Sequence, residues 1–164
     1  MLDVVTVGSA YEEILRKQAA TVADIDERIV RLSQAMIDSL SVHQGIGLAG
    51  PQVNEQLRIF VTHAQGDIPR VFINPEIIAT SDELVPYEEG CLSLPGIWAD
   101  VMRPAAVTIQ AWNEKGKPFT LDAEGVLARV IQHEFDHLRG RLFVDRLNEK
   151  KRERLMKTYV RKNG

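Results

Sequence analysis

The stretch GVLARVIQHEFDHLRG, residues 125–140, decides the fold. Apolar side chains recur in it every three or four positions, which predicts a helix from about Ala123 to Arg139 with one buried face. That face comprises Val126, Leu127, Val130, Ile131 and Leu138. We therefore expect this helix to pack against the core of the molecule.

The ends of this helix carry their own signals. Asp122 is the candidate N-cap, Glu124 suits the first turn, and Gly140 stands where a helix-ending glycine belongs. Gly125 in the first turn is expected to weaken the start by about 1 kcal/mol relative to alanine.

Inside the helix, His133-Glu134-Phe135-Asp136-His137 forms an HExxH pattern. Residues i and i+4 share one helical face, so both imidazoles can reach one ion, and the glutamate after the first histidine can contact water on that ion. Two histidines placed by chance are the plain alternative. The helical context favours the metal site.

A catalytic site of this type needs a third protein ligand and one open position. A third histidine is excluded, because Phe143 occupies its place, and Glu149 or Glu153 would have to come from a very polar helix. A lone cysteine such as Cys91 is usually a small buried hydrophobe, but Gly90 permits close backbone approach and a thiolate binds Zn²⁺ or Fe²⁺ well.

The remaining elements give the fold class. A helix is expected at Ile25–Leu40, with Asp24 as N-cap and Glu27 completing a capping box, and another at about Asn148–Val160. Asn113–Gly116 suits a hairpin turn. Leu94-Pro95-Gly96 predicts a further turn. The expected strands are Leu57–His63, Val71–Asn74, Val85–Glu88, Val107–Trp112 and Lys117–Leu121. This order predicts an α+β fold, with short, mainly antiparallel sheets around the central HExxH helix and with N-terminal and C-terminal helices.

Composition sets outer bounds. A length of 164 residues predicts a single domain over 1–164, and 45% hydrophobic with 26% charged residues is typical of an ordered globular protein. The net charge of −3 gives no nucleic-acid footprint. The chain has one cysteine, the start from Met1 to Val7 lacks a basic residue, and no stretch is long enough to span a membrane. We expect a cytoplasmic protein.

A glycine-rich segment, GIGLAGPQV, covers residues 45–53. No P-loop lysine or serine follows it, so a phosphate-binding role is poorly supported. A turn after the first helix is the plain reading. The amide of Gln52 could donate to an oxyanion.

Three segments together resemble the peptide deformylase family: the loop at residues 45–52, the segment Glu89-Gly90-Cys91-Leu92-Ser93, and Gln132 through Gly140. Their order and spacing match, and the likeness runs from about Leu32 to Asp145. Gly50 replaces the usual second alanine of the loop and is expected to loosen it. The first twenty residues match the family's usual start poorly.

The resemblance implies a metal-dependent hydrolase that removes the N-formyl group from the N-terminal methionine of new polypeptides and releases formate. It implies metal ligands Cys91, His133 and His137, with Fe²⁺ in the cell and Zn²⁺, Ni²⁺ or Co²⁺ tolerated. Metal-bound hydroxide would attack the formyl carbon with Glu134 as acid–base. Gln52 and the Leu92 backbone N–H would stabilise the oxyanion.

It also implies a substrate site. The nascent N-formylmethionyl polypeptide would pair its backbone like an added strand and insert its first side chain into a pocket. The residues implied for substrate binding are Ile46, Gly47, Tyr87, Glu89, Gly90, Val126, Val130 and His133. Asp136 is expected to contact Arg103 rather than the metal. The basic C-terminal helix is a candidate ribosome contact, with a solvated face as the default. No membrane or nucleic-acid role is required.

Two rival functions stay open. A metalloprotease that cuts internal peptide bonds would use Glu149 or Glu153 in place of the cysteine. A structural metal site without enzymatic activity would need a fourth protein ligand, such as His43 or His63, and would not use Glu134.

Overall fold

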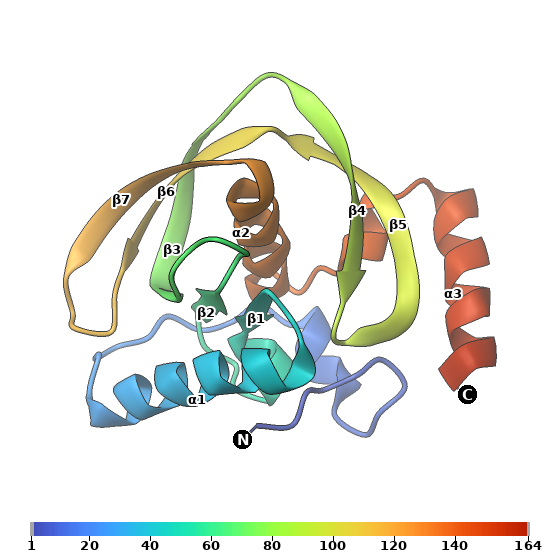
Figure 1. Cartoon of the computed structure of the whole chain (residues 1–164). Helices are drawn as coiled ribbons and strands as arrows, with labels where there is room; N and C mark the ends of the chain where they lie inside the picture. Colours follow the sequence, from blue (N-terminus) through green and yellow to red (C-terminus); the bar gives the residue numbers. More distant parts are fainter. Residues whose placement is uncertain (1, 164) are drawn as a thin grey trace.

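A computed structural model describes residues 2–163, and Figure 1 shows helix α2 (Gly125–Leu138) running through the middle, between the strands and above α1 (Glu27–His43). A five-stranded sheet has the order β1-β2-β3-β6-β7, and β4 pairs with β5 in a two-stranded sheet. Every pairing within these sheets is antiparallel. The α+β prediction is confirmed.

The strands are β1 Gly47–Ala49, β2 Ile59–Thr62, β3 Arg70–Thr80, β4 Leu84–Cys91, β5 Leu94–Pro104, β6 Ala106–Trp112 and β7 Pro118–Glu124. Short 3₁₀ turns occupy Glu12–Arg16 (η1), Gly50–Val53 (η2) and Phe143–Arg146 (η3), and α3 covers Glu149–Asn163. In the residues described, no helix is both long and apolar enough to cross a membrane.

The core forms around α2 because its apolar stripe meets the concave side of the larger sheet. Ile131 and Leu138 of α2 join Phe60, Phe72 and Ile109 in one buried cluster. The rings of Phe60 and Phe72 stack with centroids 4.6 Å apart. This packing fixes α2 against β2, β3 and β6, and thereby fixes the direction of every side chain on the helix.

The predicted helix caps need correction. Asp26, and not Asp24, caps α1, since its side chain accepts a hydrogen bond from the Ile29 N–H at 3.1 Å. Asp122 belongs to β7, where it accepts a hydrogen bond from the Thr108 hydroxyl at 2.7 Å. Glu124 occupies the N-cap position of α2 without a side-chain cap.

The prediction that Gly125 weakens α2 is also wrong. Gly125 opens the helix with φ +62°, a conformation that glycine adopts without strain and alanine does not. Gly140 follows the helix with φ +74°, as predicted, and a Cβ there would lie 2.5 Å from the Arg16 carbonyl oxygen. Glycine is therefore required at both ends of α2.

Strand β5 was not expected. Pro95 and Gly96 suggested a turn, but the turn lies earlier, at Leu92 and Ser93, because Cys91 already pairs with Leu94. The hairpin turn at 113–116 is confirmed, with the Gly116 N–H donating to the Asn113 carbonyl at 3.0 Å. The β4–β5 ribbon lies across α2 from the larger sheet and covers it from that side (Figure 1).

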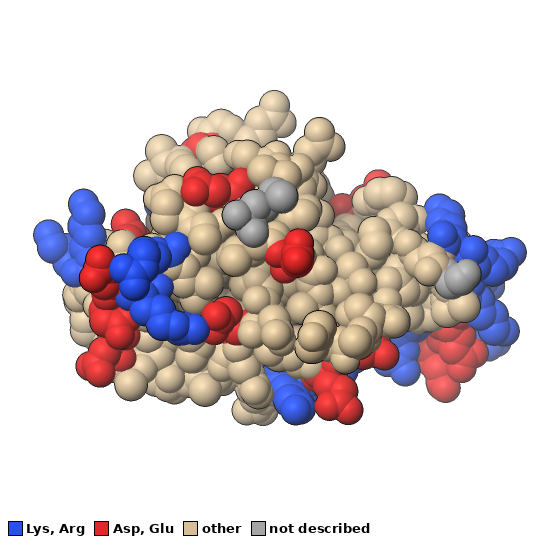
Figure 2. Space-filling model, turned by 90° about the horizontal axis from the view of Figure 1, so that it is seen from below, with Lys and Arg blue, Asp and Glu red and all other residues tan. Residues whose placement is uncertain are grey.

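Helix α3 lies against β5 at the edge of the molecule. Tyr159 is its one buried residue among 149–163, and its hydroxyl donates to the Val7 carbonyl at 2.6 Å. Figure 2 shows lysine and arginine side chains gathered at the end of the molecule where α3 lies. The helix is held by a narrow apolar seam and leaves its basic residues in solvent.

Candidate metal centre

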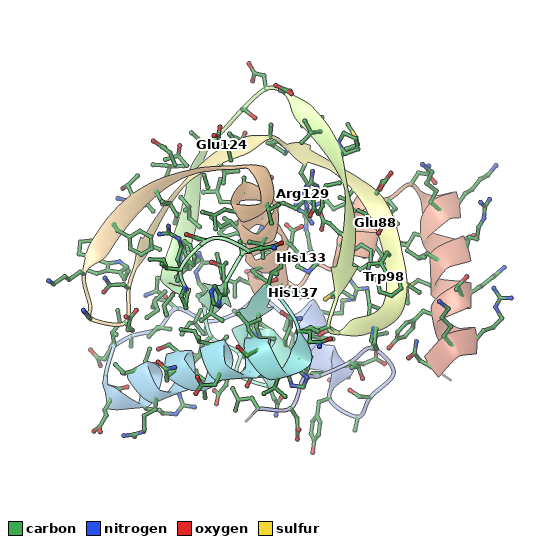
Figure 3. All side chains as sticks on the ribbon, viewed as in Figure 1. Glu88, Trp98, Glu124, Arg129, His133 and His137 are labelled. Atoms are coloured by element: carbon green, nitrogen blue, oxygen red, sulfur yellow. The ribbon has the colours of Figure 1, made fainter. Side chains whose placement is uncertain are left out.

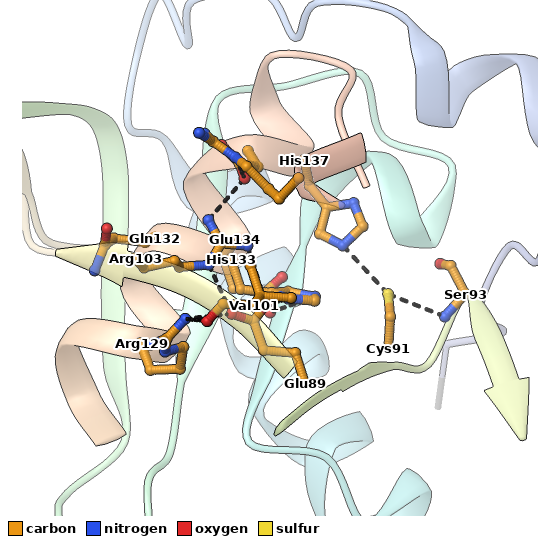
Figure 4. Close-up of polar contacts among 12 residues, drawn as sticks. Glu89, Cys91, Ser93, Val101, Arg103, Arg129, Gln132, His133, Glu134 and His137 are labelled. Carbon is orange, nitrogen blue, oxygen red and sulfur yellow. Dashed lines mark hydrogen bonds and ion pairs between the residues drawn. The ribbon is translucent and has the colours of Figure 1, made fainter. Parts of the chain in front are cut away.

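Two elements bring three soft or borderline donors together. Cys91 stands at the end of β4, and His133 and His137 come from successive turns of α2. One ligand atom from each lies within 4.8 Å of the other two, and the Cys91 Sγ is 3.4 Å from the His137 Nε2 (Figure 4). In residues 2–163 this is the one such group of three metal-ligating side chains.

The two imidazoles are oriented by their surroundings. The Nδ1 of His133 lies 2.9 Å from a Glu89 carboxylate oxygen, which leaves Nε2 on the side of Cys91. His137 is fully buried. Its ring lies edge-on to the ring of His133, with the two ring centroids 5.1 Å apart. A carboxylate behind a histidine is the usual support for a metal ligand. This donor set therefore fits a divalent ion of borderline softness, such as Zn²⁺ or Fe²⁺, with three protein ligands.

Burial and neighbours set the protonation of both rings. Burial lowers the pKa of His133, but hydrogen bonds with Cys91 and Glu89 outweigh it and raise the pKa well above its ordinary value. Burial and the nearby His133 hold the pKa of His137 well below its ordinary value. A ligand imidazole must give up its proton, so ion binding at His133 would release one.

Behind His133 lies a buried ion-pair network. Arg103 binds both oxygens of Glu89 at 2.7 and 3.0 Å and donates to Asp136 at 2.8 Å. Arg129 donates to Glu89 at 2.8 Å, and Arg146 donates to both oxygens of Asp136, at 2.6 and 3.0 Å. The predicted Asp136–Arg103 contact is confirmed. Burial raises the pKa of Glu89, but hydrogen bonds from His133 and Arg103 bring it down to about 2.

Glu134 lies beside the three donors. It is 2% exposed, its Oε1 has no hydrogen-bond partner among the described residues, and its Oε2 is 4.0 Å from the His133 Nε2. Burial raises the pKa of Glu134 to about 7. A Cβ on Gly47 would lie 2.5 Å from both the Glu134 Oε2 and a Val130 methyl carbon, so β1 approaches this carboxylate closely because residue 47 is glycine.

The glycine-rich loop positions Gln52. The side-chain Oε1 of Gln52 accepts from the Ala49 N–H at 2.9 Å, and its Nε2 donates to the Ser93 hydroxyl at 3.2 Å and the Cys91 sulfur at 3.5 Å. The amide N–H groups thus face the β4–β5 turn that contains Leu92. The prediction that Gly50 loosens the loop is wrong. A Cβ at this position would lie 2.7 Å from two backbone carbonyl oxygens, so the loop can pack this tightly because residue 50 is glycine.

A cleft of about 550 Å³ opens onto these residues. Val126 is not among the described residues that line the cleft; it sits one turn before Val130, 38% exposed. His137 is buried behind the cleft wall. The cleft lining includes the predicted residues Ile46, Gly47, Gln52, Tyr87, Glu89, Gly90, Cys91, Leu92, Val130, His133 and Glu134.

Two further cleft residues were not anticipated from the sequence. Trp98 of β5, labelled in Figure 3, lines the cleft. It packs over Gly90, where a Cβ would meet its indole at 2.5 Å. Arg129 is 5% exposed although it is charged. Its position one turn before His133, on the same helical face, was the available signal for it.

The rival ligands lie elsewhere. Glu149 and Glu153 are exposed on α3, and His63 is exposed after β2. The His43 Nε2 lies 3.1 Å from the Leu2 carbonyl oxygen. Neither a downstream glutamate nor a third histidine joins Cys91, His133 and His137 within the described chain.

Comparison with known proteins identifies the family of this chain. Residues 1–153 match the family model described as polypeptide deformylase. A peptide deformylase of Borreliella burgdorferi is 45% identical over 153 residues, 93% of each chain, and one of Treponema pallidum is 43% identical over 93% of this chain and 94% of its own.

Solved structures agree as well. A peptide deformylase from Legionella pneumophila superposes with a TM-score of 0.91 at 37% identity, covering 98% of this chain and 94% of that one. A peptide deformylase from Synechococcus elongatus, solved in complex with actinonin, superposes with a TM-score of 0.89 at 38% identity, covering 97% and 88%.

Proposed function

The chain belongs to the peptide deformylase family, and from that membership we propose a role for each residue of the metal centre. The protein removes the N-formyl group from the N-terminal methionine of newly synthesised polypeptides by hydrolysis and releases formate. The observation that carries the assignment of roles is the approach of Cys91, His133 and His137 within 4.8 Å of one another, beside the buried Glu134 and at the wall of the cleft.

Cys91, His133 and His137 would hold a divalent ion, Fe²⁺ in the cell. When bound there, such an ion lowers the pKa of water at the open position and polarises the formyl carbonyl. The soft sulfur and two imidazoles suit Fe²⁺ or Zn²⁺ better than the hard ions Mg²⁺ and Ca²⁺. Glu89 keeps the His133 ring in place through the 2.9 Å contact with Nδ1.

Glu134 moves the proton. It accepts a proton from the attacking water and donates it to the departing α-amine as the formyl C–N bond breaks, while the water oxygen remains in formate. A carboxyl group with a pKa near 7 can do both at neutral pH. Burial without a hydrogen-bond partner leaves its Oε1 available for this exchange.

Gln52 and the Leu92 N–H stabilise the negative charge that develops on the formyl oxygen. The Gln52 side-chain oxygen accepts a hydrogen bond from the Ala49 N–H, which fixes the orientation of the amide. Its N–H groups therefore point toward the β4–β5 turn before substrate binds. Loss of one such donor costs about 10²–10³ in rate.

The peptide binds along the cleft like an added strand. Ile46, Gly47 and Gly90 offer backbone groups from the β1 and β4 sides, because β1 ends one sheet and β4 has a partner on one side alone. The methionine side chain enters between Tyr87, Val130 and the His133 ring. Glu89, which is paired with Arg103, Arg129 and His133, also lines this part of the cleft. Val126 would contact the substrate at the mouth of the cleft.

Formate release from formyl-Met-Ala-Ser by anaerobically prepared iron protein tests this function. We expect release that depends on iron and disappears in Cys91→Ser together with the bound metal. A Cys91→Ser protein with normal metal content would favour the metalloprotease, with another residue as third ligand.

The setting of the reaction is also a proposal. We place the chain in the cytoplasm as one catalytic domain over 1–164, since nascent chains are made there and the ligand thiol stays reduced. α3 contacts the ribosome through its basic side chains. Ribosome pelleting with the full chain and with a chain lacking residues 148–164 tests this contact, and equal binding would contradict it.

A further inference from the structure

A second pocket, of about 510 Å³, lies on the opposite side of α2 from the metal centre. Gln132, Phe135 and Arg139 line it, whereas Val130 and His133 line the cleft. At 100° per residue these two sets fall on opposite faces of one helix. Figure 4 shows Gln132 and Arg103 on the side of α2 away from Cys91. No step of the proposed reaction takes place in this second pocket, although Arg103 and Asp136 of its lining belong to the network that holds Glu89.

The pocket carries an excess of positive charge. Its lining includes the guanidinium groups of Arg58, Arg103, Arg139 and Arg146 against the carboxylates of Glu76 and Asp136. Arg58 pairs with Glu76 at 3.0 Å, while Asp136 is shared between Arg103 and Arg146. Arg139 forms no ion pair with any residue in 2–163. Because Arg103 also binds Glu89, Arg139 is the one guanidinium group of the lining without a carboxylate partner among residues 2–163.

The walls of the pocket are partly dry and apolar. Arg103 is 3% exposed and Gln132 is 7% exposed, so they form a dry inner wall, whereas the unpaired Arg139 is exposed. Ile77, Phe135 and Leu138 supply apolar surface between the arginines. The Arg58 guanidinium lies 5.9 Å from the centre of the Phe135 ring. A ligand that matches both features carries one anionic group and a short apolar body.

We propose that this pocket binds a small organic carboxylate. The carboxylate pairs with the guanidinium groups of Arg139 and Arg146, whose planar donors suit a two-oxygen anion. The apolar body lies against Phe135 and Ile77. Arg146 can contact both Asp136 and the ligand, because its side chain is 38% exposed while it donates to Asp136. The proposal does not depend on the reaction at the metal centre.

Titration of the ¹⁵N-labelled holoenzyme tests it, with the arginine Nε–Hε signals as readout. The probe is hexanoate at constant pH and ionic strength. Hexan-1-ol has the same body without the charge, and acetate has the charge without the body. We expect saturable shifts of the Arg139 and Arg146 signals with hexanoate, and much weaker effects of hexanol and acetate.

A matched pair of variants locates the site. Arg139→Gln removes a lining charge and should weaken hexanoate binding about tenfold, the usual effect of losing one charge-assisted hydrogen bond. Arg141→Gln removes the same charge from an exposed residue that does not line the pocket, and should change binding less than twofold. Equal losses in the two variants would overturn the proposal. So would hexanoate shifts confined to the cleft, because they would mean binding at the metal alone.

Discussion

Helices α2 and α3 are of similar length and both carry many charged residues, yet they behave as opposites. α2 buries Arg129, Glu134 and Asp136, whereas α3 buries Tyr159 and leaves its charges exposed. Arg129 and Asp136 have fixed partners at hydrogen-bond distance, whereas Glu134 has none among residues 2–163 and its nearest contact, with the His133 Nε2, is at 4.0 Å. The contrast shows that the chemistry of this chain depends on where a charge lies and on what holds it, and not on how many charges a helix carries.

The energetics follow the same division. A solvated ion pair contributes about 0–1 kcal/mol, because water screens it and the long side chains lose entropy. Removing one partner of a buried pair leaves a charge in a medium of low dielectric and costs about 3–5 kcal/mol. The same substitution should therefore have very different effects on or behind α2 and on α3.

Glu134→Gln should give the largest effect. The amide keeps the size of the side chain but cannot accept the water proton, so kcat for formate release should fall about 10²–10⁴-fold with metal content unchanged. Glu153→Gln on α3 is the matched control and should retain full activity. Full activity in the Glu134 variant would show that the proton moves through another group.

Arg103→Leu should be next. It removes the cation shared by Glu89 and Asp136, both nearly fully buried, so the free energy of unfolding in urea should fall by about 3–5 kcal/mol. Arg154→Leu on exposed α3 should change it by less than about 0.5 kcal/mol. Comparable losses in the two variants would remove the distinction between the helices.

Acid should reveal the Glu89 network. The folded-state pKa of Glu89 is about 2, below its ordinary value of 4.5, so its contribution is complete above pH 4.5 and is lost as the pH falls toward 2. Urea unfolding of chelator-treated protein should show a loss of about 3 kcal/mol over this range, and Glu89→Gln should show a flatter curve. Identical curves for the two proteins would refute this role of Glu89.

Lys157→Gln should have the smallest effect. Lys157 is exposed on α3, so neither stability nor activity on formyl-Met-Ala-Ser should change beyond experimental error. Ribosome pelleting is the assay in which this variant could differ from the unaltered chain. A tenfold loss of tripeptide activity would mean that α3 contributes to the cleft.

Much of the site was predictable because it is local. The HExxH pattern places His133, Glu134 and His137 on two successive turns of one helix. The periodicity of apolar residues alone predicted that helix. Cys91 required knowledge of tertiary structure, since 41 residues separate it from His133 in the sequence of 164. Resemblance to a family supplied that link, and periodicity could not.

The misses have physical causes. β5 was overlooked because Pro95 and Gly96 resemble turn residues, yet a proline is tolerated in a strand that has a partner on one side alone. Asp24 and Asp26 are equally good caps by composition, and the position of Ile29 relative to the core selects Asp26. Arg129 was missed because its partners, Glu89 and the Val85 and Val101 carbonyls, lie on the β4–β5 sheet, 28 to 44 residues away in the sequence.

X-ray absorption spectroscopy of the zinc-loaded chain tests the central claim most directly. We predict one sulfur at about 2.3 Å and two imidazole nitrogens at about 2.0–2.1 Å, with a light atom from solvent as the fourth neighbour. The sulfur contribution should vanish in Cys91→Ser. A first shell without sulfur, or one completed by a fourth protein ligand, would contradict the claim that Cys91, His133 and His137 form an open catalytic centre.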